Sequence, residues 1–94
     1  MKISDIKTTT DKVNLEAKIL EKGEPREVNT ARGPTRVAEC TLEDDSGTII
    51  LVLWGDQIDS VKEGDKIRVS NGYVKEWNGA LQVNAGKFGK IEVV

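Results

Sequence analysis

Residues 66–84, KIRVSNGYVKEWNGALQVN, predict a β-hairpin. Apolar and polar residues alternate from Lys66 and again from Ala80, which is the two-residue period of a strand with one buried face. Asn78-Gly79 lies between the two runs and is the strongest short sequence signal for a tight hairpin turn. We therefore predict one strand that starts at Lys66 and a second at about residues 80–84.

Gly72 decides which side chains of the first of these strands face outward. Strict alternation from Ile67 would send Asn71 into the core, where its amide would need hydrogen-bond partners. A glycine inside a strand often marks a bulge, which adds one residue and reverses the alternation beyond it. A bulge at Gly72 places Val74 in the core. It also turns three side chains to the outer face together: Tyr73, Lys75 and Trp77.

Three further segments have strand patterns. They span residues 13–21, 35–43 and 48–54, and a Gly- and Pro-punctuated loop or irregular hairpin at residues 21–35 joins the first two. The strand at residues 35–43 places Ala38, Cys40 and Leu42 on one face. The DDSG sequence at residues 44–47 predicts a turn, because its side chains bond their own backbone and its glycine accepts a positive φ angle.

One short helix or helical turn is expected between the strand at residues 48–54 and the strand that starts at Lys66. Ile58 and Val61 would face inward, and Gly64 would end this element. The terminal IEVV is expected to add a short closing strand. Five short strands with this one helical element predict an all-β fold, a five-stranded OB-fold barrel. A chain of 94 residues is enough for one modest core, so we expect a single domain at residues 1–94.

The composition argues against catalysis and against a membrane protein. No apolar run approaches the ~18 residues of a membrane span, and the N-terminus lacks the apolar stretch of a signal peptide, so we expect a cytoplasmic protein. The chain has no histidine and a single cysteine, Cys40, which we interpret as a small core residue. Asp44 and Asp45 are interpreted as turn-capping residues. Since no phosphate-binding loop is present either, we expect no enzyme activity, no cofactor and no metal.

The net charge of −2 is unevenly distributed. Residues 39–65 carry eight carboxylates and one lysine, whereas residues 26–38 carry three arginines and one glutamate. Residues 66–94 carry five basic and two acidic residues. Because a folded domain presents local fields, the two basic segments are compatible with a basic groove, and ordinary surface variation is the alternative.

Trp54, Tyr73 and Trp77 are three of only four aromatic residues in the chain. Burying one ring is worth roughly 4–6 kcal/mol at ~25 cal/mol/Å², so exposing three of them indicates a use. Single-stranded nucleic acid is a natural partner, because base–aromatic stacking contributes about 1–3 kcal/mol per base. The alternative is a satellite cluster packed under a loop, and Trp54 is compatible with either face of its strand.

Residues 23–49 and 53–91 together resemble the archaeal single-stranded DNA-binding proteins, which are OB-fold domains akin to those of replication protein A. The most specific pieces are LWG at residues 53–55 and the pattern NGY…W-x-G…Q-x-N-x-G at residues 71–86. The resemblance implies a protein that binds and protects single-stranded DNA with little sequence preference, in DNA replication, recombination or repair. The family's acidic C-terminal tail, which recruits partner proteins, has no counterpart in residues 1–94.

The resemblance also implies roles for individual residues. The positions that match base-stacking aromatics are Trp54, Tyr73 and Trp77, and Val28 matches an apolar side chain that packs on the nucleic acid. Backbone contacts are implied for Arg26, Arg32, Arg36, Lys75 and Lys87. Gln82 and Asn84, predicted to face outward, are candidates for hydrogen bonds to base edges, with Ile50 and Val52 as the floor beside Trp54.

Two other functions are compatible with the same residues. The first is an RNA- or tRNA-binding OB domain, because stacking does not distinguish ribose from deoxyribose. The second is a protein-interaction module of a larger complex, which the net acidity favours. We expect a monomer with single-stranded DNA as its partner.

Overall fold

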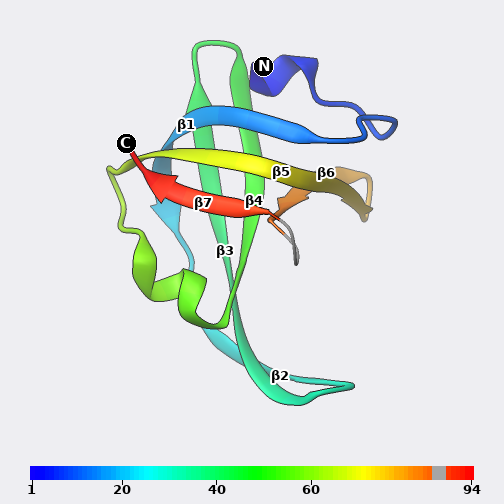
Figure 1. Ribbon diagram of the computed structural model, residues 1–94, viewed down its shortest axis with the longest axis vertical. Coiled ribbons are helices and arrows are strands. Elements are labelled where there is room, and N and C mark those ends of the chain that lie inside the picture. The colour runs from blue at the N-terminus through cyan, green and yellow to red at the C-terminus, as the bar shows by residue number, and fades with distance from the viewer. Residues whose placement is uncertain (86–88) are drawn as a thin grey trace.

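The computed structural model describes residues 1–85 and 89–94, and in these residues it shows one seven-stranded sheet and two short 3-10 helices (Figure 1). The strands are β1 (Val13–Lys22), β2 (Arg26–Thr30), β3 (Gly33–Asp44), β4 (Gly47–Trp54), β5 (Lys66–Trp77), β6 (Ala80–Asn84) and β7 (Lys90–Val93). The order β1-β3-β4-β6-β5, with β1 also paired to β5, closes five of them into a ring. This ring confirms the predicted all-β OB fold.

The segment predicted as a loop or irregular hairpin is a regular hairpin of β2 and the first part of β3. Thr30 pairs with Gly33, whose φ angle of 109° suits the left-handed position after the turn. The Thr30 hydroxyl donates to the Gly33 carbonyl at 2.8 Å and accepts the Arg32 N–H at 3.2 Å. The hairpin projects away from the ring (Figure 1). Its residues have no core to face, which explains why apolar periodicity did not reveal it.

The predicted helical element is a 3-10 helix, η2 (Gly55–Ser60), which is shorter than expected. Ile58 and Val61 are buried as predicted, but Gly64 does not end the helix and lies in the turn before β5 with a φ angle of 90°. The Lys22 ammonium donates to the carbonyl oxygens of Ile58 and Val61, which holds the end of the element against the ring. No helix within residues 1–85 and 89–94 is long and apolar enough to cross a membrane.

The inward faces of the ring supply the hydrophobic core. Ala38, Cys40 and Leu42 are fully buried on the inner side of β3, as the alternation predicted. Burial raises the pKa of the Cys40 thiol, so this cysteine stays protonated and acts as a core residue.

The N-terminal 3-10 helix, η1 (Ile3–Asp5), is fixed to the β3–β4 turn. Asp44 accepts the Ile3 N–H at 2.8 Å and the Ser46 N–H at 2.7 Å, which confirms its capping role. Desolvation tends to raise the pKa of Asp44, but the hydrogen bonds from Ser46 and Ile3 outweigh it and lower the pKa. The carboxylate therefore joins the N-terminal segment and the turn at one end of the molecule.

A bulge in β5 sets the side from which each later side chain projects. Val13 pairs with Gly72 and Leu15 pairs with Val69, so β5 contains one more residue than β1 over the same interval. The positive φ angle of the bulge, 53°, belongs to Asn71 rather than to Gly72. The predicted reversal is confirmed, because the core-facing series continues through Gly72 while Tyr73 is exposed.

Asn71 and Gly72 have different functions in the bulge. The Asn71 N–H donates to Asn14 Oδ1 at 3.1 Å, so a side chain of β1 satisfies the group that leaves the ladder. A Cβ atom at Gly72 would lie 3.0 Å from both the backbone carbonyl oxygen of Asn84 and a methyl group of Val69. Gly72 is therefore required for close packing rather than for its φ angle.

We predict that Gly72→Ala lowers the free energy of unfolding by about 1–3 kcal/mol, because the new methyl group overpacks a site bounded by backbone. Asn71→Gly is the matched control, since glycine adopts the left-handed conformation without strain, and it should leave stability nearly unchanged. Urea unfolding followed by circular dichroism measures both. Wild-type stability in the Gly72→Ala protein would show that this close contact does not constrain the bulge.

Candidate nucleic-acid interface

Cross-strand register gathers side chains from five strands on one outer surface, because directly paired residues project to the same side of a sheet. One row contains Arg26, Val37 and Trp54. The next row contains Glu39, Val52, Asn84 and Tyr73. A third row contains Thr41, Ile50, Gln82 and Lys75. We call these three rows, together with Val28 and the Trp77–Ala80 pair, the aromatic face.

The three aromatic side chains of this face are largely open to solvent. Trp54, Tyr73 and Trp77 are 40%, 46% and 60% exposed. Trp54 therefore projects outward, which decides the orientation that the sequence left open. None of the three rings is packed under a loop of the described chain. Phe88, the fourth aromatic residue, lies outside the described residues.

An apolar floor lies beneath the rings. Val37 and Val52 are almost fully buried, although they project from the outer side of the sheet and are not part of the core cluster. Ile50, two residues before Val52 on β4, is half-buried. Ile50 and Val52 project to the same side of β4 as Trp54, and Val37 pairs directly with Trp54, so these three apolar residues lie on the aromatic face.

Trp54 is held at two points. Its backbone N–H donates to Gln57 Oε1 at 3.1 Å where β4 gives way to η2. Its indole Nε1–H donates to Asn84 Oδ1, also at 3.1 Å. Gly55, with a φ angle of 55°, makes the sharp change of chain direction directly after Trp54, where β4 ends.

The sequence predicted that Asn84 is exposed and contacts base edges, but its side chain is buried. It projects to the aromatic face but is only 3% exposed, and its side-chain oxygen Oδ1 accepts the Trp54 indole N–H. Strand alternation identified the correct side of β6 but did not show that a bulky neighbour covers the residue. Gln82 lies on the same face and is half-buried.

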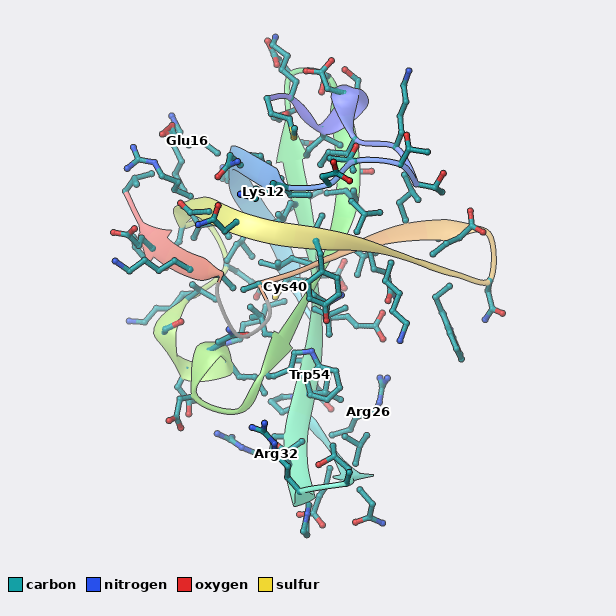
Figure 2. The ribbon with its side chains drawn as sticks, turned by 45° about the vertical axis from the view of Figure 1, so that its right-hand side comes forward. Lys12, Glu16, Arg26, Arg32, Cys40 and Trp54 are labelled. Atoms are coloured by element: carbon teal, nitrogen blue, oxygen red, sulfur yellow. The ribbon has the colours of Figure 1, made fainter. Side chains whose placement is uncertain are left out.

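Arg26 and Lys75 are the predicted cations that lie on the aromatic face. Figure 2 shows Arg26 beside Trp54, with Arg32 farther along the hairpin. Arg26 pairs with Glu39 at 3.3 Å, and both side chains are well exposed to solvent. Val28, in register with Thr35, is half-buried on the same side of the hairpin as Arg26.

Three other predicted basic residues have different positions. The structure does not bring Arg36 to the aromatic face, because its side chain projects from the opposite side of β3 and forms an ion pair with Asp59 of η2 at 2.9 Å. Arg32 is exposed in the hairpin turn. Lys87 lies outside the described residues. The alternation predicted for residues 35–43 already implies the orientation of Arg36, because Arg36 lies two residues before Ala38.

Most of the acidic segment lies away from the aromatic face. Its carboxylates occupy the β3–β4 turn (Asp44, Asp45), η2 (Asp56, Asp59) and the turn before β5 (Glu63, Asp65). Glu39 is the single carboxylate within the three rows and had no predicted role. Among the described residues, no group of three or more potential ligands is placed to hold a metal ion.

Two cavities lie differently relative to this surface. One, of about 760 Å³, is lined mainly by β1, β5 and the N-terminal segment and shares no residue with the aromatic face. A smaller cavity of about 340 Å³ touches one end of the face at Thr41, Ile50 and Ala80. The candidate interface is an open surface, which suits a long, flexible ligand better than a small molecule.

Residues 5–93 match the family model described as "Single-stranded DNA binding protein Ssb-like, OB fold", and the chain belongs to this family. It is 32% identical over 90 residues to the single-stranded DNA binding protein Ssb of Saccharolobus solfataricus. The match covers 96% of this chain and 61% of that protein, so the chain spans about three-fifths of its relative's length.

Solved structures of archaeal OB domains are similar over the whole chain. An OB domain from Thermoplasma acidophilum superposes with a TM-score of 0.87 at 28% identity, covering 85% of that chain. The second OB-fold domain of replication protein A from Methanococcus maripaludis gives a TM-score of 0.81 at 27% identity, covering 93% of that chain.

Proposed function

We propose that this domain binds single-stranded DNA on the aromatic face, with little sequence preference, and protects it during replication, recombination or repair. Bases stack on Trp54, Tyr73 and Trp77, while Arg26, Lys75 and the hairpin residue Arg32 contact phosphates. The domain acts by binding and catalyses no reaction. The observation that carries the proposal is the shared face of three exposed aromatic rings in a protein of a single-stranded DNA-binding family.

The bound strand is extended rather than helically stacked. Tyr73 and Trp77 lie four residues apart on one strand, a separation of roughly 13 Å. Stacked bases in a duplex are only about 3.4 Å apart along each strand. Neighbouring stacked bases therefore cannot reach both rings, and the strand must unstack to use them. Sequences with weak self-stacking, such as oligo-dT, should bind more readily than oligo-dA.

Stacking and phosphate contacts contribute differently to affinity. Three rings would supply roughly 3–9 kcal/mol of stacking. Association costs an estimated 4–15 kcal/mol, so phosphate contacts are needed for useful affinity. With two or three cations in contact, the salt dependence for a single strand should have a slope of only about −1.4 to −2.1.

We predict that Trp54→Ala and Trp77→Ala each weaken oligo-dT binding about 5- to 150-fold, which corresponds to the loss of about 1–3 kcal/mol of stacking. Quenching of tryptophan fluorescence measures wild-type binding, and the anisotropy of a labelled oligo-dT measures it in every variant. Leu20→Ala is the control, because Leu20 is an exposed apolar residue of β1 outside the aromatic face. Competition with a matched RNA oligomer measures the preference for DNA.

Absence of quenching by oligo-dT at low salt would refute the proposal. Equal losses in the Leu20→Ala and tryptophan variants would refute the assignment of the stacking surface.

We predict that Glu39→Gln strengthens oligo-dT binding up to about fivefold. The substitution removes the carboxylate of the aromatic face and an exposed ion pair of the kind worth about 0.2–1 kcal/mol, which frees Arg26 for phosphate. Arg26→Gln should weaken binding and reduce the salt slope by about 0.7.

Arg36→Gln is the matched control for Arg26→Gln, because Arg36 lies on the opposite side of β3. It should leave the affinity and the salt slope unchanged. A loss as large as that of Arg26→Gln would place the DNA path on the other side of the hairpin.

A further inference from the structure

We infer that Asn84 is a positioning residue that fixes the indole of Trp54 for stacking and does not itself contact bases. The inference rests on the proposed function. Asn84 is the one polar side chain that is buried among the described residues. Its Oδ1 accepts the Trp54 Nε1–H at 3.1 Å, although the Trp54 ring remains 40% exposed.

The strand register explains how Asn84 reaches the ring. Asn84 is the last residue of β6 and pairs with Val52 on β4 and Tyr73 on β5. Trp54 follows Val52 by two residues, so its side chain projects from the same side of β4. The Asn84 amide therefore lies between the two aromatic residues, under the edge of the indole.

Burial of this amide has a cost that the hydrogen bond offsets. An amide removed from water without a partner is destabilising, whereas a hydrogen-bonded one is tolerated. An apolar residue at position 84 would pack without this cost, but the indole N–H would lose its acceptor. The chemistry of the pair thus favours orientation of the ring over additional packing.

The hydrogen bond has two consequences for binding. It holds the indole by its edge and leaves the ring face open, so less side-chain freedom is lost when a base stacks. It also occupies the Trp54 N–H, while burial leaves the Asn84 side-chain oxygen little access to bases. Trp54 then recognises only the π-face that all bases share, which favours binding without sequence preference.

A double-mutant cycle separates positioning from direct contact with DNA. Asn84→Ala removes the acceptor, and Trp54→Phe removes the donor while it keeps an aromatic ring. We expect Asn84→Ala to weaken oligo-dT binding about 2- to 12-fold with Trp54 present and less than twofold in the Trp54→Phe protein. The anisotropy of a labelled oligo-dT gives all four affinities. Equal loss in both backgrounds would show that Asn84 contacts the strand directly and would overturn the inference.

A measurement without DNA tests the positioning separately. In the Trp77→Phe protein, fluorescence anisotropy decay reports the motion of Trp54 alone, since the chain has only two tryptophans. Asn84→Ala should increase the motion of the indole, Asn84→Asp should restore the fixed ring because it keeps an acceptor oxygen, and Gln82→Ala should have no effect. Unchanged motion in a folded Asn84→Ala protein, with folding checked by urea unfolding, would overturn the inference even if the wild-type protein bound oligo-dT. Failure of the wild-type protein to bind oligo-dT would instead refute the proposed function.

Discussion

The extra residue that β5 inserts opposite β1 is the constraint on which the aromatic face depends. Before the bulge, Ile67 and Val69 face the core. After it, Tyr73 and the residues two and four positions beyond it face outward. Without the bulge, the same residues would place two aromatic rings and a lysine in a core that has no room for them. The side chain of Asn14 on β1 accepts the Asn71 N–H of the bulge, so the strand pair that closes the ring also contains the bulge.

The location of the charges, more than their total, determines the field over the aromatic face of this acidic chain. The acidic segment follows β3 and β4, yet most of its carboxylates fall in the turns and in η2. Asp44 caps the β3–β4 turn and Asp59 binds Arg36, so these charges have structural partners. Arg26 and Lys75 reach the aromatic face from strands outside this segment. A net charge of −2 therefore gives no information about the field that a bound strand would meet.

The ring, the bulge and the outward aromatic residues were predictable because each follows from alternation and turn chemistry within a few residues. The Asn78-Gly79 turn, for example, has the positive φ angles of 50° and 81° that its sequence demands. The β2–β3 hairpin was not predictable in this way, since a strand that covers no core has no apolar period. The backbone contact implied for Arg36 came from the family resemblance, whereas strand alternation with Ala38 places this side chain on the other side of β3. The burial of Asn84 depends on a tryptophan 30 positions away, so it follows only from register between β4 and β6.

Two pairs of polar side chains on the aromatic face bond to one another. The Trp54 indole donates to Asn84, and Arg26 forms an ion pair with Glu39. The indole N–H, which is able to hydrogen-bond to a base, and the guanidinium, which is able to bind phosphate, therefore already have protein partners. A ligand that relied on specific hydrogen bonds would have to displace these partners and leave buried groups unpaired, which is costly for Asn84 and cheap for the exposed Arg26 pair. The two interactions therefore differ in consequence. The indole bond favours a rigid stacking ring, whereas the exposed ion pair allows an arginine to exchange a carboxylate for a phosphate.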